Sequence, residues 1–510
     1  MQKKLLAVAV LSAFSGLAAA QSANVTLYGT IVQNVEQVSA TGGDGSTAAG
    51  TSSARTGIGG GRVSAAANAA GVADQENRFR FNPAGTNFGI RGTEDLGNGL
   101  SAWFQMELAA QMGNSPPTGG TLLGTAASYR NSAVGLRSNT WGTALFGMWD
   151  TPFNTMVNAL NVNGRSGAAS SNHSANMLGG NVFAQGAVSG QATQAWCAAT
   201  PSVTVPANPS AAATVVAVAG AIVSSAAACA NFGMNFDRRE RSSIQWWSPN
   251  WNGFEARVAY NVTADNGGVT ASNQSFGRNT LKQSIWDLSA SYTNGGLYVG
   301  YAYERQNDTL AAGARTFIGA AGGIGAGEGT GAWTMGTAAA AAAGNSHMSG
   351  SSGVGHRLGA RYRIGNSGFT VGAMWESLKW GMRYSVDAGA AAAAAQLLTG
   401  LSKSAYRLQG NYVTGKHYIG LDYIRANAMT GSIASATAVA ANTFDGSNTG
   451  ARAWQLGYNY MLSKRTSIGA YYNTIRNETN ANYSGIVFGG MATPPGGSPK
   501  YLGMHVRHSF

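Results

Sequence analysis

The 510-residue chain has little charge and no excess of apolar residues. Asp, Glu, Lys and Arg make up 11% of it, against about 25% in ordinary soluble proteins. Hydrophobic residues account for 44%, a fraction usual for soluble proteins and lower than a bundle of transmembrane helices requires. Gly, with 72 residues, has about twice its usual share. A chain in which lipid-facing and water-facing residues alternate has this composition.

Cysteine is nearly absent, with only Cys197 and Cys229 in the chain. Neither lies in a CxxC motif and no His stands nearby at ligand spacing, so a metal site or a cysteine nucleophile is disfavoured. Such a pair usually forms a bridge in an oxidising compartment. We therefore predict a Cys197–Cys229 disulfide within a loop.

The side-chain arrangements of enzymes are missing as well. The six histidines lie in no Asp/His or Ser/His motif, whereas a catalytic site needs a base, a nucleophile and an orienting partner. The chain contains no phosphate-cradling or nucleic-acid-binding motif. We therefore expect no enzyme activity, no cofactor, no metal and no nucleic-acid partner. The formal net charge is +12, or +10 without Lys3 and Lys4, and without such a motif this excess does not indicate nucleic-acid binding.

Two segments are rich in small and apolar residues. Residues 1–20 carry Lys3 and Lys4, an apolar stretch and Ala18-Ala19-Ala20, the pattern of a cleaved signal peptide, which leaves 21–510 as the mature chain. Residues 211–230 are long enough to span a bilayer. They consist mostly of Ala, Val and Ser without flanking charges, which favours a loop insertion over a transmembrane helix.

The dominant rhythm after residue 20 is alternation with a period of two, the pattern of β-strands in a transmembrane barrel. In 100–108, for example, Trp103, Gln105 and Glu107 share one side. We predict an all-β, antiparallel transmembrane barrel of sixteen strands. The strands are expected at 25–38, 77–93, 99–110, 128–137, 142–149, 239–248, 253–262, 283–293, 297–307, 356–364, 369–380, 404–413, 417–429, 451–462, 466–478 and 500–510.

Connections between these strands are alternately short and long. Turns such as 94–99 (EDLGNG) and 365–368 (GNSG) alternate with long segments rich in Gly, Ala and Ser, such as 150–236 and 308–355. Short periplasmic turns and long extracellular loops are the layout of outer-membrane barrels. A barrel of sixteen to eighteen strands encloses an aqueous channel.

The order and spacing of several local motifs resemble the general porins of Gram-negative bacteria, specifically those of β-proteobacteria. The motifs are 25–29 (VTLYG), 88–99 (FGIRGTEDLGNG), 243–254 with its Ser-Ile, Ser-Pro and Gly-Phe pairs, 462–466 (LSKRT) and the C-terminal 505–510 (HVRHSF). The resemblance implies an outer-membrane location, a sixteen-stranded barrel, a homotrimer, and a third extracellular loop folded into the pore. That loop would be the constriction-loop region 150–236, with its Ala-rich insertion. The terminal Phe510 is expected to seal the last strand beside the first.

Alternation indicates which charges face the lumen. Phe79, Phe81, Ile244 and Trp246 suit the outer face, and a charge on that face would cost about 2–4 kcal/mol near the bilayer midplane. Five arginines then take inward positions: Arg78, Arg80, Arg91, Arg239 and Arg241. The alternative for each is a rim position that binds lipopolysaccharide or a carboxylate. For Arg78 and Arg80 the sequence favours neither the lumen nor the rim.

Similarity to the family adds Arg130 and Arg239 as arginines of the pore wall. Between Thr151 and Phe236 the chain has no Asp or Glu, so only Glu107 and Asp150 offer negative charge near the narrow point. Unopposed arginines concentrate anions. The family often has Arg where this chain has Asn87 and Gly-Arg where it has Gly147-Met148, so the expected anion preference is mild.

The sequence therefore predicts passive diffusion of small hydrophilic solutes, anions above others, through a homotrimeric porin among outer-membrane lipids and lipopolysaccharide. The alternative is an adhesin or structural barrel whose channel is largely closed by the loop insertion. Tyrosines such as Tyr28, Tyr298, Tyr418 and Tyr471 are expected in the aromatic girdles at the two membrane interfaces, rather than in a sugar-stacking track on the inner face.

Overall fold

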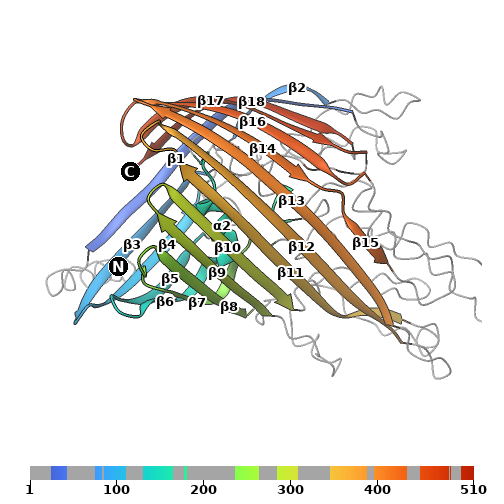
Figure 1. Ribbon diagram of the computed structural model, residues 1–510, viewed down its shortest axis with the longest axis horizontal. Coiled ribbons are helices and arrows are strands. Elements are labelled where there is room, and N and C mark those ends of the chain that lie inside the picture. The colour runs from blue at the N-terminus through green and yellow to red at the C-terminus, as the bar shows by residue number, and fades with distance from the viewer. Residues whose placement is uncertain are drawn as a thin grey trace, which may run out of the picture.

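A computed structural model describes residues 24–42, 75–82, 85–110, 130–164, 177–180, 236–262, 284–307, 345–387, 396–433, 448–479, 481, 483 and 496–510. These residues form one antiparallel sheet closed into a barrel, with a helix inside it (Figure 1). The helix is α2(Pro152–Ala159). Among the described residues, none of the helices is long and apolar enough to cross a membrane.

The strands follow one another around the barrel in chain order. They are β1(Asn24–Thr41), β2(Gln75–Asn82), β3(Asn87–Gly97), β4(Leu100–Ala109), β5(Ser132–Ser138), β6(Gly142–Asp150), β7(Arg239–Trp247), β8(Phe254–Val262), β9(Ser284–Asn294), β10(Leu297–Asn307), β11(Asn345–Arg363), β12(Phe369–Asp387), β13(Gln396–Thr414), β14(His417–Ala426), β15(Thr430–Ile433), β16(Ala451–Met461), β17(Thr466–Asn477) and β18(Ser498–Ser509).

These labelled segments make sixteen strands of the barrel wall, as the sequence predicts. β2 and β3 both pair with β1, β2 through Val35↔Phe81 and β3 through Thr26↔Arg91, so they are two parts of one wall strand. β14 and β15 likewise follow each other along β13. The interruption between β2 and β3 falls beside Pro83 in the sequence, a residue without the N–H that a central strand needs.

Three strands are longer than the alternating pattern indicates. β11, β12 and β13 reach residues 345, 387 and 396, whereas the sequence predicts their ends at 356, 380 and 404 (Figure 1). Their ladders continue through Asn345↔Asp387 and Ser385↔Gln396. Backbone pairing needs no apolar alternation, and Gly- and Ala-rich segments carry none. The sequence prediction of loop at these positions is therefore wrong.

The barrel closes where the last strand meets the first. β1 pairs with β18 from Thr30↔Ser509 to Thr41↔Ser498. Beyond the ladder, the Phe510 N–H donates to Gly29 O at 3.0 Å and the Gly29 N–H donates to Phe510 O at 3.2 Å. A Cβ on Gly29 would lie 2.6 Å from Cζ of Phe510, so the ring lies over a position that only glycine leaves free. Closure pairs the edges that lipid would not tolerate open.

Deleting Phe510 should lower the yield of folded barrel and leave the conductance of correctly assembled barrels unchanged. The deletion removes both hydrogen bonds to Gly29 and the ring over it. Gly29→Leu should act in the same way, because its side chain would displace the ring. Quantifying folded protein after refolding into detergent checks this prediction. A truncated chain that folds at wild-type yield would disprove the role of Phe510.

Alternation separates the two faces of the wall. Large apolar side chains point outward, with Phe79 77% and Met504 69% exposed. Residues at the alternate positions point inward, where Glu36 and Asn34 of β1 and His505 of β18 are buried. The outer face is therefore suited to lipid, and polar groups collect inside.

Candidate functional site

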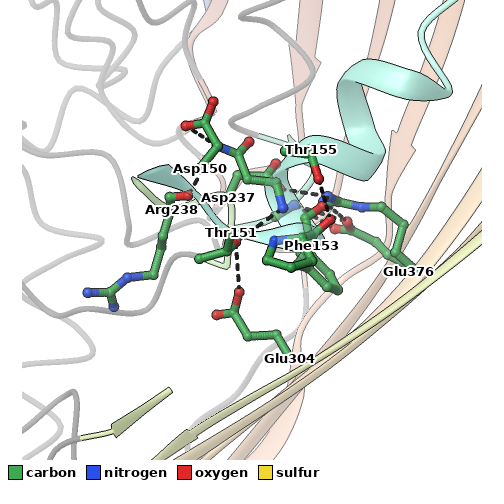
Figure 2. Close-up of polar contacts among 12 residues, drawn as sticks. Asp150, Thr151, Phe153, Thr155, Asp237, Arg238, Glu304 and Glu376 are labelled. Carbon is green, nitrogen blue, oxygen red and sulfur yellow. Dashed lines mark hydrogen bonds and ion pairs between the residues drawn. The ribbon is translucent and has the colours of Figure 1, made fainter. Parts of the chain in front are cut away.

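The chain leaves β6 and turns into the barrel as α2. The helix begins where Thr151 Oγ1 accepts the N–H of Asn154 at 3.2 Å, with Pro152 in the first turn, a favourable N-terminal pairing. Thr151 Oγ1 also donates to the Glu304 carboxylate of β10 at 3.2 Å (Figure 2). The Phe153 N–H donates to Asp287 of β9 at 2.8 Å. Two wall acids thus hold the start of the helix.

The residues after α2 continue along the inner wall. The Val162 N–H donates to the Gln409 side chain of β13 at 3.0 Å, and Asn163 Nδ2 donates to Leu421 O of β14 at 2.8 Å. The wall glycine Gly359 makes room for Leu160, since a Cβ there would lie 2.6 Å from Leu160 Cδ1. The described part of the loop therefore covers the inner face from β9 to β14.

A buried set of charges, here called the loop anchor, joins the loop to this wall. It consists of Asp237 on the loop, Arg357 on β11, Glu376 on β12 and Lys403 on β13. The Arg357 guanidinium contacts Asp237 at 2.7 Å and Glu376 at 2.8 Å, and no side chain of the three is more than 3% exposed (Figure 2). Burial raises the pKa of Asp237, and the neighbouring Arg357 opposes that rise.

The loop backbone completes the loop anchor. Arg357 donates to Phe153 O at 2.8 Å, Lys403 donates to Met177 O at 2.6 Å, and the Gly179 N–H donates to Glu376 at 2.8 Å. The wall charges thus bind three separate points of the loop. Sequence reasoning missed them, although strand alternation does give them inward positions.

Residues predicted for the pore wall meet at the loop root, where β6 ends at Asp150. The Arg130 Nε donates to the Glu107 carboxylate, and the Arg239 guanidinium lies 3.0 Å from Asp150. Asn131 supports the second pair, because its amide oxygen accepts from Arg239 Nε at 2.8 Å and its amide nitrogen donates to Asp150 at 3.0 Å. The Arg130 side chain keeps 33% of its surface exposed. Sequence reasoning named both arginines and both acids but missed Asn131.

Tyr28 extends this group to Arg91. Its hydroxyl donates to Glu107 at 3.0 Å, and the Arg91 guanidinium lies 4.9 Å from the centre of its ring. We call Arg91, Arg130, Arg239, Glu107 and Asp150 the pore cluster. Three guanidinium groups and two carboxylates leave it one net positive charge. The prediction of unopposed arginines is therefore wrong, because the two wall acids lie directly against Arg130 and Arg239.

Arg239 reaches the pore cluster across an irregularity in the ladder. Gly147 pairs with Ser243, but Trp149 pairs with Glu240, so β7 carries one extra residue between these pairs. Such a bulge shifts the alternation of every residue beyond it, and the facing of Arg239 cannot be counted from Ile244. Arg241 lies on the bulged stretch, and its side chain is outside the described residues.

Arg78 and Arg80 take inward positions on β2, opposite Val38 and Glu36 of β1. Arg80 contacts Glu36 at 2.6 Å, and Glu36 also accepts the Tyr471 hydroxyl at 2.8 Å. Arg80 is therefore charge-paired on the inner wall, outside the pore cluster.

Four tyrosines expected in the outer girdles lie on the inner face instead. Tyr28 contacts Glu107 and Tyr471 contacts Glu36. Tyr298 donates to Met156 of α2, and Tyr418 donates to Val162 O of the loop. Each hydroxyl thus has a hydrogen-bond acceptor inside the barrel. Other tyrosines of the wall, such as Tyr301 and Tyr472, are exposed outside.

Several predictions fall on residues that the structure does not describe. They are the signal peptide 1–20, the segment 211–230 and the Cys197–Cys229 disulfide. The disulfide stays a prediction: alkylation of denatured, non-reduced protein should add no mass, whereas two labelled thiols would contradict it. Within the described ranges, no group of three or more His, Cys, Asp or Glu could hold a metal ion.

Comparisons with known proteins find similarity to porins at the level of both sequence and fold. A family model described as Gram-negative porin matches residues 7–480. An outer membrane porin protein of Bordetella pertussis is 35% identical over 156 residues, which cover 29% of this chain and 33% of that protein. The match thus spans about a third of the curated relative's length. The solved anion-selective porin from Comamonas acidovorans has a similar fold, with a TM-score of 0.53, 17% identity, and coverage of 96% of this chain and 100% of that one.

Proposed function

Because the chain belongs to the Gram-negative porin family, we propose that it forms an outer-membrane channel through which small hydrophilic solutes diffuse passively, with a mild preference for anions. The fold is the transmembrane β-barrel of that family, with an apolar outer face and a polar inner one. Both this family and this fold are those of channel proteins rather than of enzymes.

One observation carries the proposal. The loop that leaves β6 is fixed to the inner faces of β9–β14 by the loop anchor and by its own backbone hydrogen bonds. A loop held against one side of the wall narrows a barrel of this size without any moving part. Selection by radius and by fixed charge is what such a narrowing provides.

The anion preference depends on the pore cluster. Its single net positive charge and the partly exposed Arg130 side chain attract anions, while Glu107 and Asp150 limit the effect. The named solved neighbour is anion-selective, and the same property in this chain is our proposal. We also propose a homotrimer in contact with outer-membrane lipids and lipopolysaccharide, which the resemblance implies and cross-linking of purified protein tests.

Liposome swelling tests the diffusion function. Vesicles containing the purified protein should swell in uncharged sugars at rates that fall steadily as the sugar becomes larger, because a fixed narrowing excludes by size. Vesicles without protein serve as the control. No swelling in the smallest sugar would favour the alternative function, a structural barrel closed by its loop.

A further inference from the structure

Three tryptophans gather on the inner face, away from the loop anchor. Trp103 of β4, Trp149 of β6 and Trp247 of β7 have ring centres 5.6 Å (Trp103–Trp149), 5.5 Å (Trp149–Trp247) and 6.4 Å (Trp103–Trp247) apart. Gly135 of β5 makes this packing possible, since a Cβ there would lie 2.8 Å from Trp103 Nε1. Neither the lipid-facing wall nor the loop accounts for indoles in this position.

Two arginines flank these rings. The Arg137 guanidinium of β5 lies 5.8 Å from the centre of the Trp103 ring, and that of Arg257 on β8 lies 4.8 Å from the centre of the Trp247 ring. They stand in one row of paired residues, Arg137↔Thr143↔Trp247↔Arg257. A cation over a ring face is held by the ring quadrupole, which leaves guanidinium N–H groups for another partner.

Arg137 and Arg257 differ from Arg130 and Arg239, which are in direct contact with Glu107 and Asp150. Within the described part of the chain, neither Arg137 nor Arg257 has a carboxylate within ion-pair distance. Glu255, two residues from Arg257 on β8, is the acid whose charge acts on it, and its carboxylate accepts from Asn250 at 3.1 Å. Arg257 is half-buried, and Arg137 is exposed.

The side chains of the group point into the lumen. The outward neighbours Leu136, Ile244 and Phe254 are 42%, 48% and 41% exposed, so Arg137, Trp247 and Arg257 point the other way. Trp149 and Trp247 are half-buried and keep ring surface for a ligand. Arg137 lies one residue from the end of β5, and Trp247 ends β7, so these two residues lie at the short-turn side of the wall. Trp149 lies one residue before the other end of β6, where the long loop begins, so the group extends from the short turns towards the loop root.

We propose that Trp103, Trp149, Trp247, Arg137 and Arg257 form a subsite for aromatic carboxylates passing through the pore. A carboxylate accepts two N–H groups from a guanidinium in parallel, and a flat ring packs on an indole. An aliphatic carboxylate makes the hydrogen bonds to the guanidinium but has no ring to pack on the indole. This inference rests on the proposed channel function and gives it a preferred class of anion.

Benzoate and acetate separate the two contacts, because both carry one carboxylate and only benzoate carries a ring. Single-channel current of the wild-type protein in potassium chloride is recorded while each is added. Benzoate should halve the current at a concentration about 3- to 10-fold below that of acetate, the range that an aromatic pair provides. Trp149→Leu should remove this difference, and Trp149→Phe should keep part of it.

Charge is tested separately from the ring. Arg137→Gln with Arg257→Gln should weaken block by both anions, whereas Trp251→Leu, which removes an indole from the exposed turn beyond β7, should change neither. Equal potency of benzoate and acetate on wild type, or a preference kept in Trp149→Leu, overturns the subsite while leaving the channel in place. A protein that gives no current steps overturns the channel function and the subsite together.

Discussion

Replacing Arg357 with methionine is expected to destabilise the folded protein by about 3–5 kcal/mol, the usual effect of removing one partner from a buried ion pair. Its side chain is fully buried between Asp237 and Glu376. Without it, the remaining cation of the loop anchor is Lys403, which lies 4.0 Å from Glu376. Chemical unfolding in lipid vesicles measures the loss. Because Arg357 also holds Phe153 O, the open-channel current should fluctuate more.

Two variants control this prediction. Arg363→Met removes an exposed arginine from the same strand and should change stability by less than about 0.5 kcal/mol. Neutralising one partner as well, in Arg357→Met with Asp237→Asn, should recover part of the stability, because the remaining buried carboxylate of Glu376 then keeps the Lys403 ammonium as its counter-ion. If the Arg357→Met protein were as stable as Arg363→Met and its open-channel current fluctuated no more, the loop would be held by other contacts.

Removing Arg130 and Arg239 together should reverse the ion selectivity of the channel. The pore cluster has one net positive charge, and Arg130→Gln with Arg239→Gln leaves Arg91 against Glu107 and Asp150, one net negative charge. The contacts that link these groups are each shorter than a Debye length of about 8 Å, so we expect a passing ion to respond to their sum. The zero-current potential across a salt gradient should change sign towards cations.

The acids of the same cluster provide the matched test. Glu107→Gln with Asp150→Asn leaves three positive charges and should strengthen anion selectivity beyond the wild type. Arg305→Gln removes a positive charge from the outward face of β10 and should leave the potential unchanged. Equal potentials for the arginine and acid double variants would remove the basis for assigning these residues to the narrow part of the pore.

The sequence predicts the wall well because a strand's facing is a local property. Lipid selects apolar side chains at every second position, so the outward positions of Phe79 and Phe81 and the inward positions of Arg78 and Arg80 follow from their spacing. The sixteen-strand count succeeds for the same reason. The alternating pattern does not locate the ends of β11–β13, because Gly- and Ala-rich segments of a strand show no alternation of apolar and polar residues.

The inner chemistry depends on contacts between distant residues, which the pattern does not contain. Alternation gives Arg357 and Glu376 inward positions, but it cannot show that Asp237, far along the chain from both, completes their charge network. It also cannot locate the extra residue in β7 that alters the facing of Arg239. Glu107 and Asp150 were identified by type and neighbourhood, whereas their direct contact with the arginines required the three-dimensional arrangement.

The most direct test of the channel is the current carried by the purified wild-type protein in a planar bilayer with a salt gradient. The structure predicts discrete conductance steps that rise in proportion to bulk salt conductivity, as in a water-filled pore, and a small zero-current potential whose sign indicates anion preference. Bilayers that receive folded barrel but show no steps, or a wild-type channel that prefers cations, would contradict it.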